Sequence, residues 1–179
     1  MFKYLALLRG VNVGGKALIK MTDLRNSLDK AGFTNVRTYI QSGNVFFDSS
    51  NADKKLLAEK LRKIISSDFK LEVEVAIFNK QEWADIVNSA PKVWGVDKQW
   101  KHNLIVLLKP FSKEEIVDAI GSLKPDIEFL EVGSRVLYQS MSLEKYGRTT
   151  TSKLINSPLY THMTIRNYNT ATKLLQLFD

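Results

Sequence analysis

A hairpin pattern stands at Val36-Arg37-Thr38-Tyr39-Ile40-Gln41-Ser42-Gly43-Asn44-Val45-Phe46-Phe47. Two runs rich in β-branched and aromatic residues flank a polar connection, and Gly43 can adopt the positive φ that a tight turn requires. The pattern predicts two antiparallel strands. Phe46 and Phe47 are adjacent in a strand, so they point to opposite faces of the sheet. At most one of them could stack on a nucleic-acid base while the other enters the core.

Four further elements surround this hairpin in the first part of the chain. They are predicted from apolar periodicity and capping residues: a strand at 2–8, a helix from Thr22 to Gly32, a helix that Asn51 or Asp53 opens, and a strand at 72–77. The order is strand-helix-strand-strand-helix-strand, which is the order of a ferredoxin-like unit.

The second part of the chain repeats the pattern. The predicted elements are a helix opened by Asn79 with Glu82, a strand at 102–108, a helix opened by Ser112 with Glu115, strands at 127–132 and 135–139, and a final helix at 170–178. We therefore predict an α+β fold with antiparallel sheets, built by duplication from two ferredoxin-like halves of the βαββαβ type. The halves are residues 1–78 and residues 79–179, the second including the terminal helix.

Composition excludes several classes of function. The 179 residues are 44% hydrophobic and 25% charged, which is typical of a globular chain. There is no Cys and there are two His, so thiol chemistry, iron–sulfur clusters and thiolate or multi-histidine metal sites are excluded. No targeting segment is recognisable, and no apolar run approaches the ~20 residues of a membrane helix. We expect a cytoplasmic protein without a membrane partner.

The net charge of +7 favours anionic partners. Residues 1–79 carry about five excess positive charges, residues 80–131 about two excess negative charges, and residues 132–179 about four excess positive charges. The two basic ends could therefore share one anion site. The alternative is that exposed lysines only keep the protein soluble.

The first candidate site is the loop Arg9-Gly10-Val11-Asn12-Val13-Gly14-Gly15-Lys16-Ala17, which follows the first strand. Its spacing matches a phosphate-binding P-loop up to the last position, where Ala17 lacks the hydroxyl that holds magnesium. A nucleotide hydrolase of that type is therefore rejected. A simpler anion-binding nest remains, to which these residues would contribute: Arg9, Asn12, Gly14, Gly15 and Lys16. The alternative is an ordinary turn with solvated cations.

The second candidate site lies near the C-terminus, where cations alternate with hydroxyl and amide groups. Residues 149–152 supply four hydroxyls, and the residues predicted to bind an anion are Arg148, Lys153, Arg166, Asn167 and Asn169, with Asn44 joining from the hairpin turn. Structural roles are equally open: helix capping for the last two asparagines, hydrogen bonding to loop carbonyls for Arg166, and the turn itself for Asn44. We predict that the two candidate segments become neighbours in one basic cleft.

No catalytic residue can be assigned from spacing. His102 and His162 have no Ser or Asp at a telling distance along the chain, and neither Asp126 nor Glu144 has a visible carboxylate partner. No metal and no cofactor are predicted.

Three motifs together resemble one known family. They are Ala6-Leu7-Leu8-Arg9-Gly10-Val11-Asn12-Val13-Gly14-Gly15, Tyr39-Ile40-Gln41-Ser42-Gly43-Asn44-Val45-Phe46 and Met163-Thr164-Ile165-Arg166-Asn167-Tyr168-Asn169-Thr170. On these motifs the chain resembles the bacterial domain-of-unknown-function family 1697, in which Tyr168 is more often Trp. The resemblance implies a duplicated ferredoxin-like fold and no assigned activity.

Three functions fit these observations. The first is a binding module that takes a phosphorylated or nucleotide-like ligand, or nucleic acid, in a basic cleft. The second is a transferase-like enzyme acting on a phosphorylated substrate in the same cleft. The third is a structural or oligomerising domain that pairs through an exposed sheet face; the sequence leaves the oligomeric state open.

Overall fold

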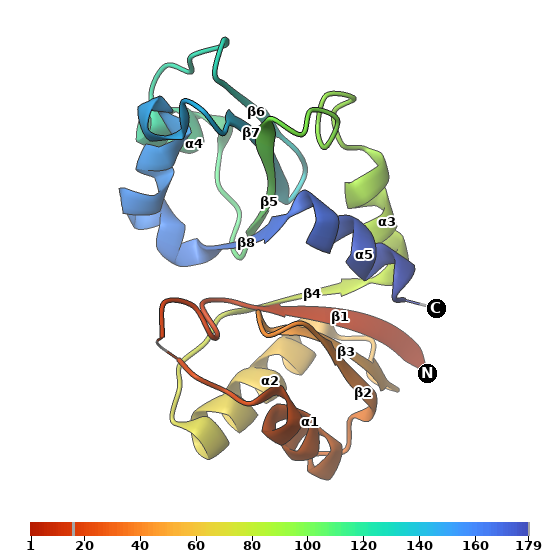
Figure 1. Ribbon diagram of the computed structural model, residues 1–179. Coiled ribbons are helices and arrows are strands. Elements are labelled where there is room, and N and C mark those ends of the chain that lie inside the picture. The colour runs from red at the N-terminus through yellow and green to blue at the C-terminus, as the bar shows by residue number, and fades with distance from the viewer. Residues whose placement is uncertain (16, 179) are drawn as a thin grey trace. The chain divides into compact units, whose positions relative to one another are not determined.

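The computed structural model describes residues 1–15 and 17–178, apart from the side chain of Lys113. The chain forms two compact units (Figure 1). Unit 1 comprises residues 1–84 together with the C-terminal residues from Leu174 onward, and unit 2 comprises Asp85–Lys173. The boundaries fall within α3 (Lys80–Asn88) and α5 (Tyr168–Gln176). The division of the chain into domains at residue 78 stays a prediction.

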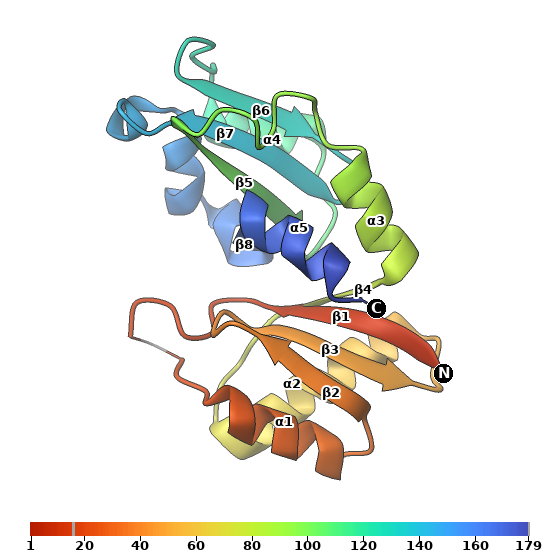
Figure 2. The same ribbon diagram turned by 45° about the vertical axis from the view of Figure 1, so that its right-hand side comes forward.

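Unit 1 holds one four-stranded antiparallel sheet with two helices on one face (Figures 1 and 2). Its elements in chain order are β1 (Phe2–Leu8), α1 (Met21–Lys30), β2 (Thr34–Tyr39), β3 (Asn44–Ser49), α2 (Lys54–Phe69) and β4 (Val75–Asn79). The strand order β2-β3-β1-β4 places the first and third strands at the centre. The mixed, antiparallel architecture predicted from the sequence is confirmed.

Both faces of this sheet are covered. Alternation along β1 and β3 sends Tyr4 and Phe47 into the core beneath α1 and α2, with Phe33 packing edge-on against Phe47. The opposite face carries Phe46, whose ring contacts that of Phe178 at 5.2 Å between centroids. Phe178 is fully buried, so residues 174–178 pack on this face of the sheet as part of unit 1.

Capping residues explain where most helices begin. Asp53 accepts hydrogen bonds from the amides of Lys55 and Leu56 at the start of α2, as predicted. Asn79 and Glu82 exchange the two bonds of the predicted capping box. The predicted cap of the first helix at Thr22 is wrong. α1 begins one residue earlier, at the buried Met21, without any side-chain cap.

Unit 2 holds a second four-stranded antiparallel sheet with the order β6-β7-β5-β8. Its elements are β5 (Trp100–Leu107), α4 (Lys113–Ile120), β6 (Glu128–Val132), β7 (Val136–Ser142), the short 3₁₀ helices η1 (Tyr146–Arg148), η2 (Thr151–Asn156) and η3 (Pro158–His162), and β8 (Met163–Asn167). The order repeats that of the first sheet, which confirms two similar halves.

The second half departs from the first at one place. Three 3₁₀ turns replace the helix that α2 forms in unit 1, and they lead into the edge strand β8. The sequence pattern predicted no strand at 163–167, because Thr164, Arg166 and Asn167 make this short run polar. Pairing with β5, from Asn103↔Asn167 to Leu107↔Met163, is what makes it a strand.

The two faces of the second sheet have different surroundings. Ile105 and Leu137 lie on the face that packs against α4 and η2, which we call the α4 face. His102 and Leu104 alternate with them and lie on the opposite face. In the described part of the chain, no helix is both long and apolar enough to cross a membrane.

Candidate functional site

The glycine loop after β1 is held in shape by Asn12. Its side-chain amide donates to the carbonyl oxygens of Ile19 (2.9 Å) and Gln41 (2.8 Å), while its Oδ1 accepts from the Ile19 amide (2.8 Å). Asn12 also has a φ of +57°, a conformation that asparagine tolerates better than most residues. Its side chain is therefore used to fix the loop.

The other residues of the predicted N-terminal site have different surroundings, and anion binding by them stays a prediction. Gly14 and Gly15 are exposed with positive φ, as a nest requires, and Lys16 lies outside the described residues. The side chain of Arg9 lines a surface hollow of about 500 Å³. The charged residues that line this hollow are three cations and two carboxylates: Arg9, Arg62, Lys63, Glu72 and Glu74. The two carboxylates balance two of these three positive charges.

Asn44 is fully buried at the start of β3. Its Nδ2 donates to the Tyr39 carbonyl and to the Ser42 hydroxyl, both at 3.0 Å, so its amide closes the hairpin turn. The neighbouring Gly43 has a φ of +71°, and a Cβ there would lie 2.8 Å from Cβ of Leu8. Both residues are explained by the turn.

In unit 2, the hydroxyls of residues 149–152 bind within the chain. Glu128 on β6 is buried, and its two carboxylate oxygens accept hydrogen bonds from the amides and the hydroxyls of both Thr150 and Thr151. The Lys124 amide donates a further bond of 3.0 Å. Thr150 and Thr151 thus bind a carboxylate of the protein itself, that of Glu128.

This arrangement sets the ionisation of Glu128. Burial by itself would raise the pKa of the carboxyl, but the hydrogen bonds from Thr150, Thr151 and Lys124 overcome burial and lower the pKa to about 2. Glu128 is therefore ionised at neutral pH. It anchors the 3₁₀ segment to the α4 face of the sheet.

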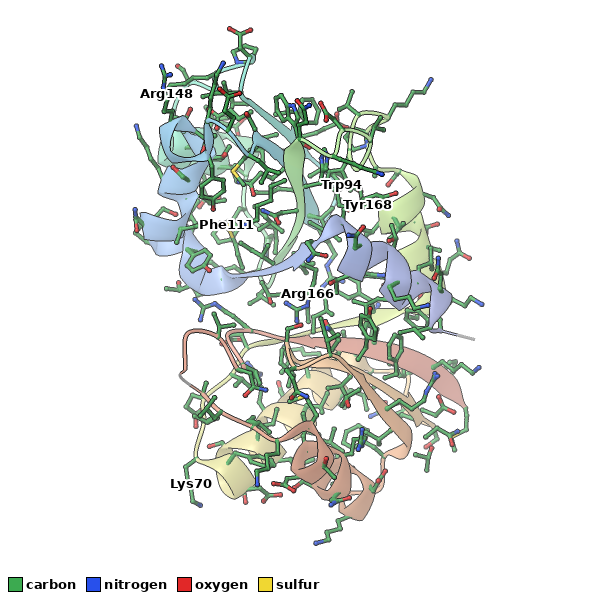
Figure 3. All side chains as sticks on the ribbon, in the orientation of Figure 1. Lys70, Trp94, Phe111, Arg148, Arg166 and Tyr168 are labelled. Atoms are coloured by element: carbon green, nitrogen blue, oxygen red, sulfur yellow. The ribbon has the colours of Figure 1, made fainter. Side chains whose placement is uncertain are left out.

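The predicted cations of unit 2 do not form one cluster. Arg148 and Lys153 are exposed on η1 and η2. Arg166 is buried on the face of the sheet opposite the α4 face, paired across from Leu104. Arg148 and Arg166 lie well apart (Figure 3). The Arg166 guanidinium donates to the Thr164 hydroxyl and the Ile165 carbonyl, both at 2.8 Å. Burial lowers the pKa of Arg166 to about 10, which still leaves it charged at neutral pH.

The two C-terminal asparagines lie at the start of α5. Asn167 accepts a hydrogen bond from the Thr170 amide at 2.8 Å, which is the predicted capping role. The Asn169 carbonyl accepts from the Thr172 hydroxyl. The grouping of the N-terminal and C-terminal segments into one cleft stays a prediction.

The structure also contains a cavity that the sequence pattern did not reveal. It has a volume of about 220 Å³ and lies on the α4 face between the sheet and the 3₁₀ segment. Its walls are Lys101, Asn103, Ile105, Gln139, Met141, Tyr146, Thr151, Ser152, Leu154, Ile155, Tyr160 and Ile165. We call it the amide cavity, because two primary amides lie at its wall.

These amides belong to Asn103 on β5 and Gln139 on β7, which are 6% and 4% exposed. Asn103 Nδ2 donates to Gln139 Oε1 at 2.8 Å. Within the described part of the chain, the Asn103 Oδ1 and the Gln139 Nε2 make no further hydrogen bond. One acceptor and one donor at the cavity wall are therefore available to bond to a ligand.

Lys101 carries the positive charge of this cavity. Among its described lining residues no other side chain is charged, and the Lys101 ammonium lies 5.0 Å from the centroid of the Tyr146 ring. No group of three or more potential metal ligands of the types His, Cys, Asp and Glu occurs among the described residues.

Comparison with known proteins places the chain in a family. The family model described as "Protein of unknown function (DUF1697)" matches residues 1–138. The chain belongs to the DUF1697 family. A solved structure, that of the conserved bacterial protein SP0830 from Streptococcus pneumoniae, is similar with 29% identity and a TM-score of 0.86, over 99% of each chain. No curated protein matches the chain.

For this DUF1697 protein, Asn103 and Gln139 are the site residues that sequence reasoning missed. Asn103 directly precedes the apolar run of one predicted strand, and Gln139 directly follows the apolar residues of another, so each is a polar residue at the end of an apolar run. Their pairing depends on the register of β5 and β7, where Asn103 lies opposite Gln139. The sequence alone does not give that register.

Proposed function

We propose that this protein binds a phosphorylated, nucleotide-like ligand in the amide cavity of unit 2. The observation that carries the proposal is the buried Asn103–Gln139 pair, which leaves an acceptor and a donor at the cavity wall. A planar heterocycle with a neighbouring donor and acceptor on its edge is complementary to such a pair, as amide side chains are to nucleobases.

The other walls suit the faces of a ring. Tyr146 and Tyr160 supply aromatic surface, and Ile105, Leu154 and Ile165 supply aliphatic surface. Bases stack on aromatic side chains with a contribution of about 1–3 kcal/mol each. The cavity is smaller than the ~300–1,000 Å³ that drug-sized ligands occupy, so it fits one ring system and leaves the phosphate outside.

Lys101 and two cations of the 3₁₀ segment suit the charged part of the ligand. Lys101 lines the cavity, and the exposed Arg148 and Lys153 lie on the same 3₁₀ segment that supplies Tyr146 and Thr151 to its wall. Such side chains bind phosphate through charge-assisted hydrogen bonds. Of the residues predicted to bind an anion, we therefore assign Arg148 and Lys153 to the phosphate.

Thermal unfolding and calorimetry with the four nucleoside 5′-monophosphates, inorganic phosphate and a short single-stranded oligonucleotide test the proposal. At least one nucleotide should stabilise the protein with a concentration dependence that follows mass action, and added salt should weaken binding. Inorganic phosphate alone should bind much more weakly. Preferential binding of the oligonucleotide would instead show a nucleic-acid function.

Two glutamine variants make the test specific. Gln139→Met keeps the length of the side chain but removes the amide, and it should raise the Kd at least tenfold. Gln99→Met changes an exposed glutamine of the same unit and should leave the Kd unchanged. Equal binding by the wild type and Gln139→Met, or no stabilisation by any nucleotide, would refute the proposal.

A further inference from the structure

A second cavity of unit 2 lies on the opposite face of the sheet and has a volume of about 420 Å³. It is mainly apolar, with side chains of Val93, Val96, Trp100 and Phe129 in its walls. Two buried polar side chains also line it, those of His102 and Ser140. They are neighbours across the sheet, because His102 on β5 lies opposite Ser140 on β7.

The hydrogen bonds around His102 fix the tautomer of its ring. Nε2 lies 2.8 Å from the backbone carbonyl oxygen of Asp97, which can only accept a hydrogen bond, so the neutral ring carries its proton on Nε2. Nδ1 is then an acceptor. The Ser140 hydroxyl, whose oxygen lies 2.8 Å away, donates a hydrogen bond to Nδ1.

This is the relationship between a nucleophile and its general base, with the base oriented by a third group. When the imidazole takes the serine proton, both ring nitrogens become donors, and the Asp97 carbonyl stabilises the imidazolium through Nε2–H. The loop that carries this carbonyl is itself held, because the Asp97 carboxylate accepts from the Gln99 amide at 2.8 Å.

We propose that Ser140 and His102 form a nucleophile–base pair that hydrolyses carboxylic esters with a small apolar acyl group. The valine and aromatic walls of the cavity would hold the acyl chain beside the Ser140 hydroxyl. This site lies on the other face of the sheet from the amide cavity, and the inference does not depend on the proposed function.

The reaction balances with water as the second substrate. Ser140 Oγ bonds to the carbonyl carbon while its proton passes to His102 Nδ1. The bond from that carbon to the alcohol oxygen then breaks, and His102 returns the proton to the departing alkoxide. A water molecule, deprotonated by His102, attacks the acyl-serine, and the released serine oxygen takes the proton back.

Labelling with a fluorophosphonate probe, followed by peptide mass mapping of the full-length wild-type protein, tests the pair directly. The adduct should map to Ser140. p-Nitrophenyl acetate and butyrate should be hydrolysed with an initial burst of p-nitrophenol whose concentration equals that of the enzyme. Because the readout is an adduct on the wild-type protein, it does not depend on whether a variant folds.

Variants then test the individual roles. Ser140→Ala should abolish the adduct and the burst, and His102→Gln should slow labelling about 100-fold or more, which is the usual contribution of a general base. Ser142→Ala, two residues along the same strand and on the same face, is the matched control and should react like the wild type. A folded wild-type protein that gives no adduct at Ser140, or unchanged ester hydrolysis by Ser140→Ala, would overturn the proposal.

Discussion

The carboxylate of Glu128 accepts hydrogen bonds from both the amide (2.8 Å) and the hydroxyl (2.9 Å) of Thr151, which lies 23 residues later in the chain. Thr150 repeats this pattern on the other carboxylate oxygen. One acidic side chain on the edge strand β6 therefore holds the start of η2. The anchored segment supplies part of the wall of the amide cavity, so the clamp positions the proposed ligand site.

Glu128→Gln should lower the free energy of unfolding at pH 7 by about 3 kcal/mol, because the carboxylate whose pKa is lowered to about 2 loses its charge and one of its two acceptor oxygens becomes an NH2 donor. The folded-state pKa lies below the unfolded value, so the stabilisation is complete above about pH 5. It disappears as the pH falls toward 2. Urea unfolding at several pH values measures this effect.

The difference in stability between wild type and Glu128→Gln should therefore shrink steadily from pH 5 to pH 3. A constant difference over this range would show that the carboxyl titrates at an ordinary pKa in the folded state.

Thr151→Val should raise the pKa of Glu128, because it removes one hydroxyl donor and keeps the shape of the side chain. We expect the acid unfolding midpoint to move upward and stability at pH 7 to fall by about 1–2 kcal/mol. Thr161→Val is the control, since the exposed Thr161 hydroxyl donates to the nearby Pro158 carbonyl and, among the described residues, to no other group. Acid unfolding, monitored by circular dichroism, measures the midpoint for both variants, and only that of Thr151→Val should move.

Gly43→Ala should destabilise the protein by about 2–4 kcal/mol, since the positive φ and the contact with Leu8 both oppose a Cβ. Gly32→Ala isolates the first of these costs. Gly32 has a φ of +86°, but a Cβ added there would meet nothing within 4 Å, so we expect about 1 kcal/mol. If chemical denaturation gave the same loss of stability for Gly43→Ala and Gly32→Ala, a steric clash between the Cβ added at position 43 and Leu8 would be ruled out.

Asn12→Ala should loosen the glycine loop, because it removes the three side-chain hydrogen bonds to Ile19 and Gln41. The Ile19 amide, which donates to the Asn12 side chain, should exchange with deuterium at least tenfold faster. Amide exchange by NMR provides the measurement. Unchanged protection at Ile19 would show that the loop is held by its backbone alone.

Local sequence patterns were sufficient for most of the fold. Period-two and helical periodicity, with the hairpin at 41–44, predicted the order of strands and helices in unit 1, and the capping residues Asp53 and Ser112 marked two helix starts. These features depend on residues a few positions apart, whose conformational preferences are intrinsic to the chain. β8 lacked such a signal, because a short polar strand is defined by its partner.

By itself, the sequence determined two antiparallel α+β halves, a basic chain, and the exclusion of thiol and multi-histidine chemistry. Only the tertiary structure decided which side chains meet. Asn103 bonds to Gln139 across 36 residues, and His102 bonds to Ser140 across 38. Both pairs follow from the register between β5 and β7. A shift of one residue in either strand would send the side chains of that strand to the other face and separate both pairs. That register is fixed by packing of the whole unit, which no local pattern encodes.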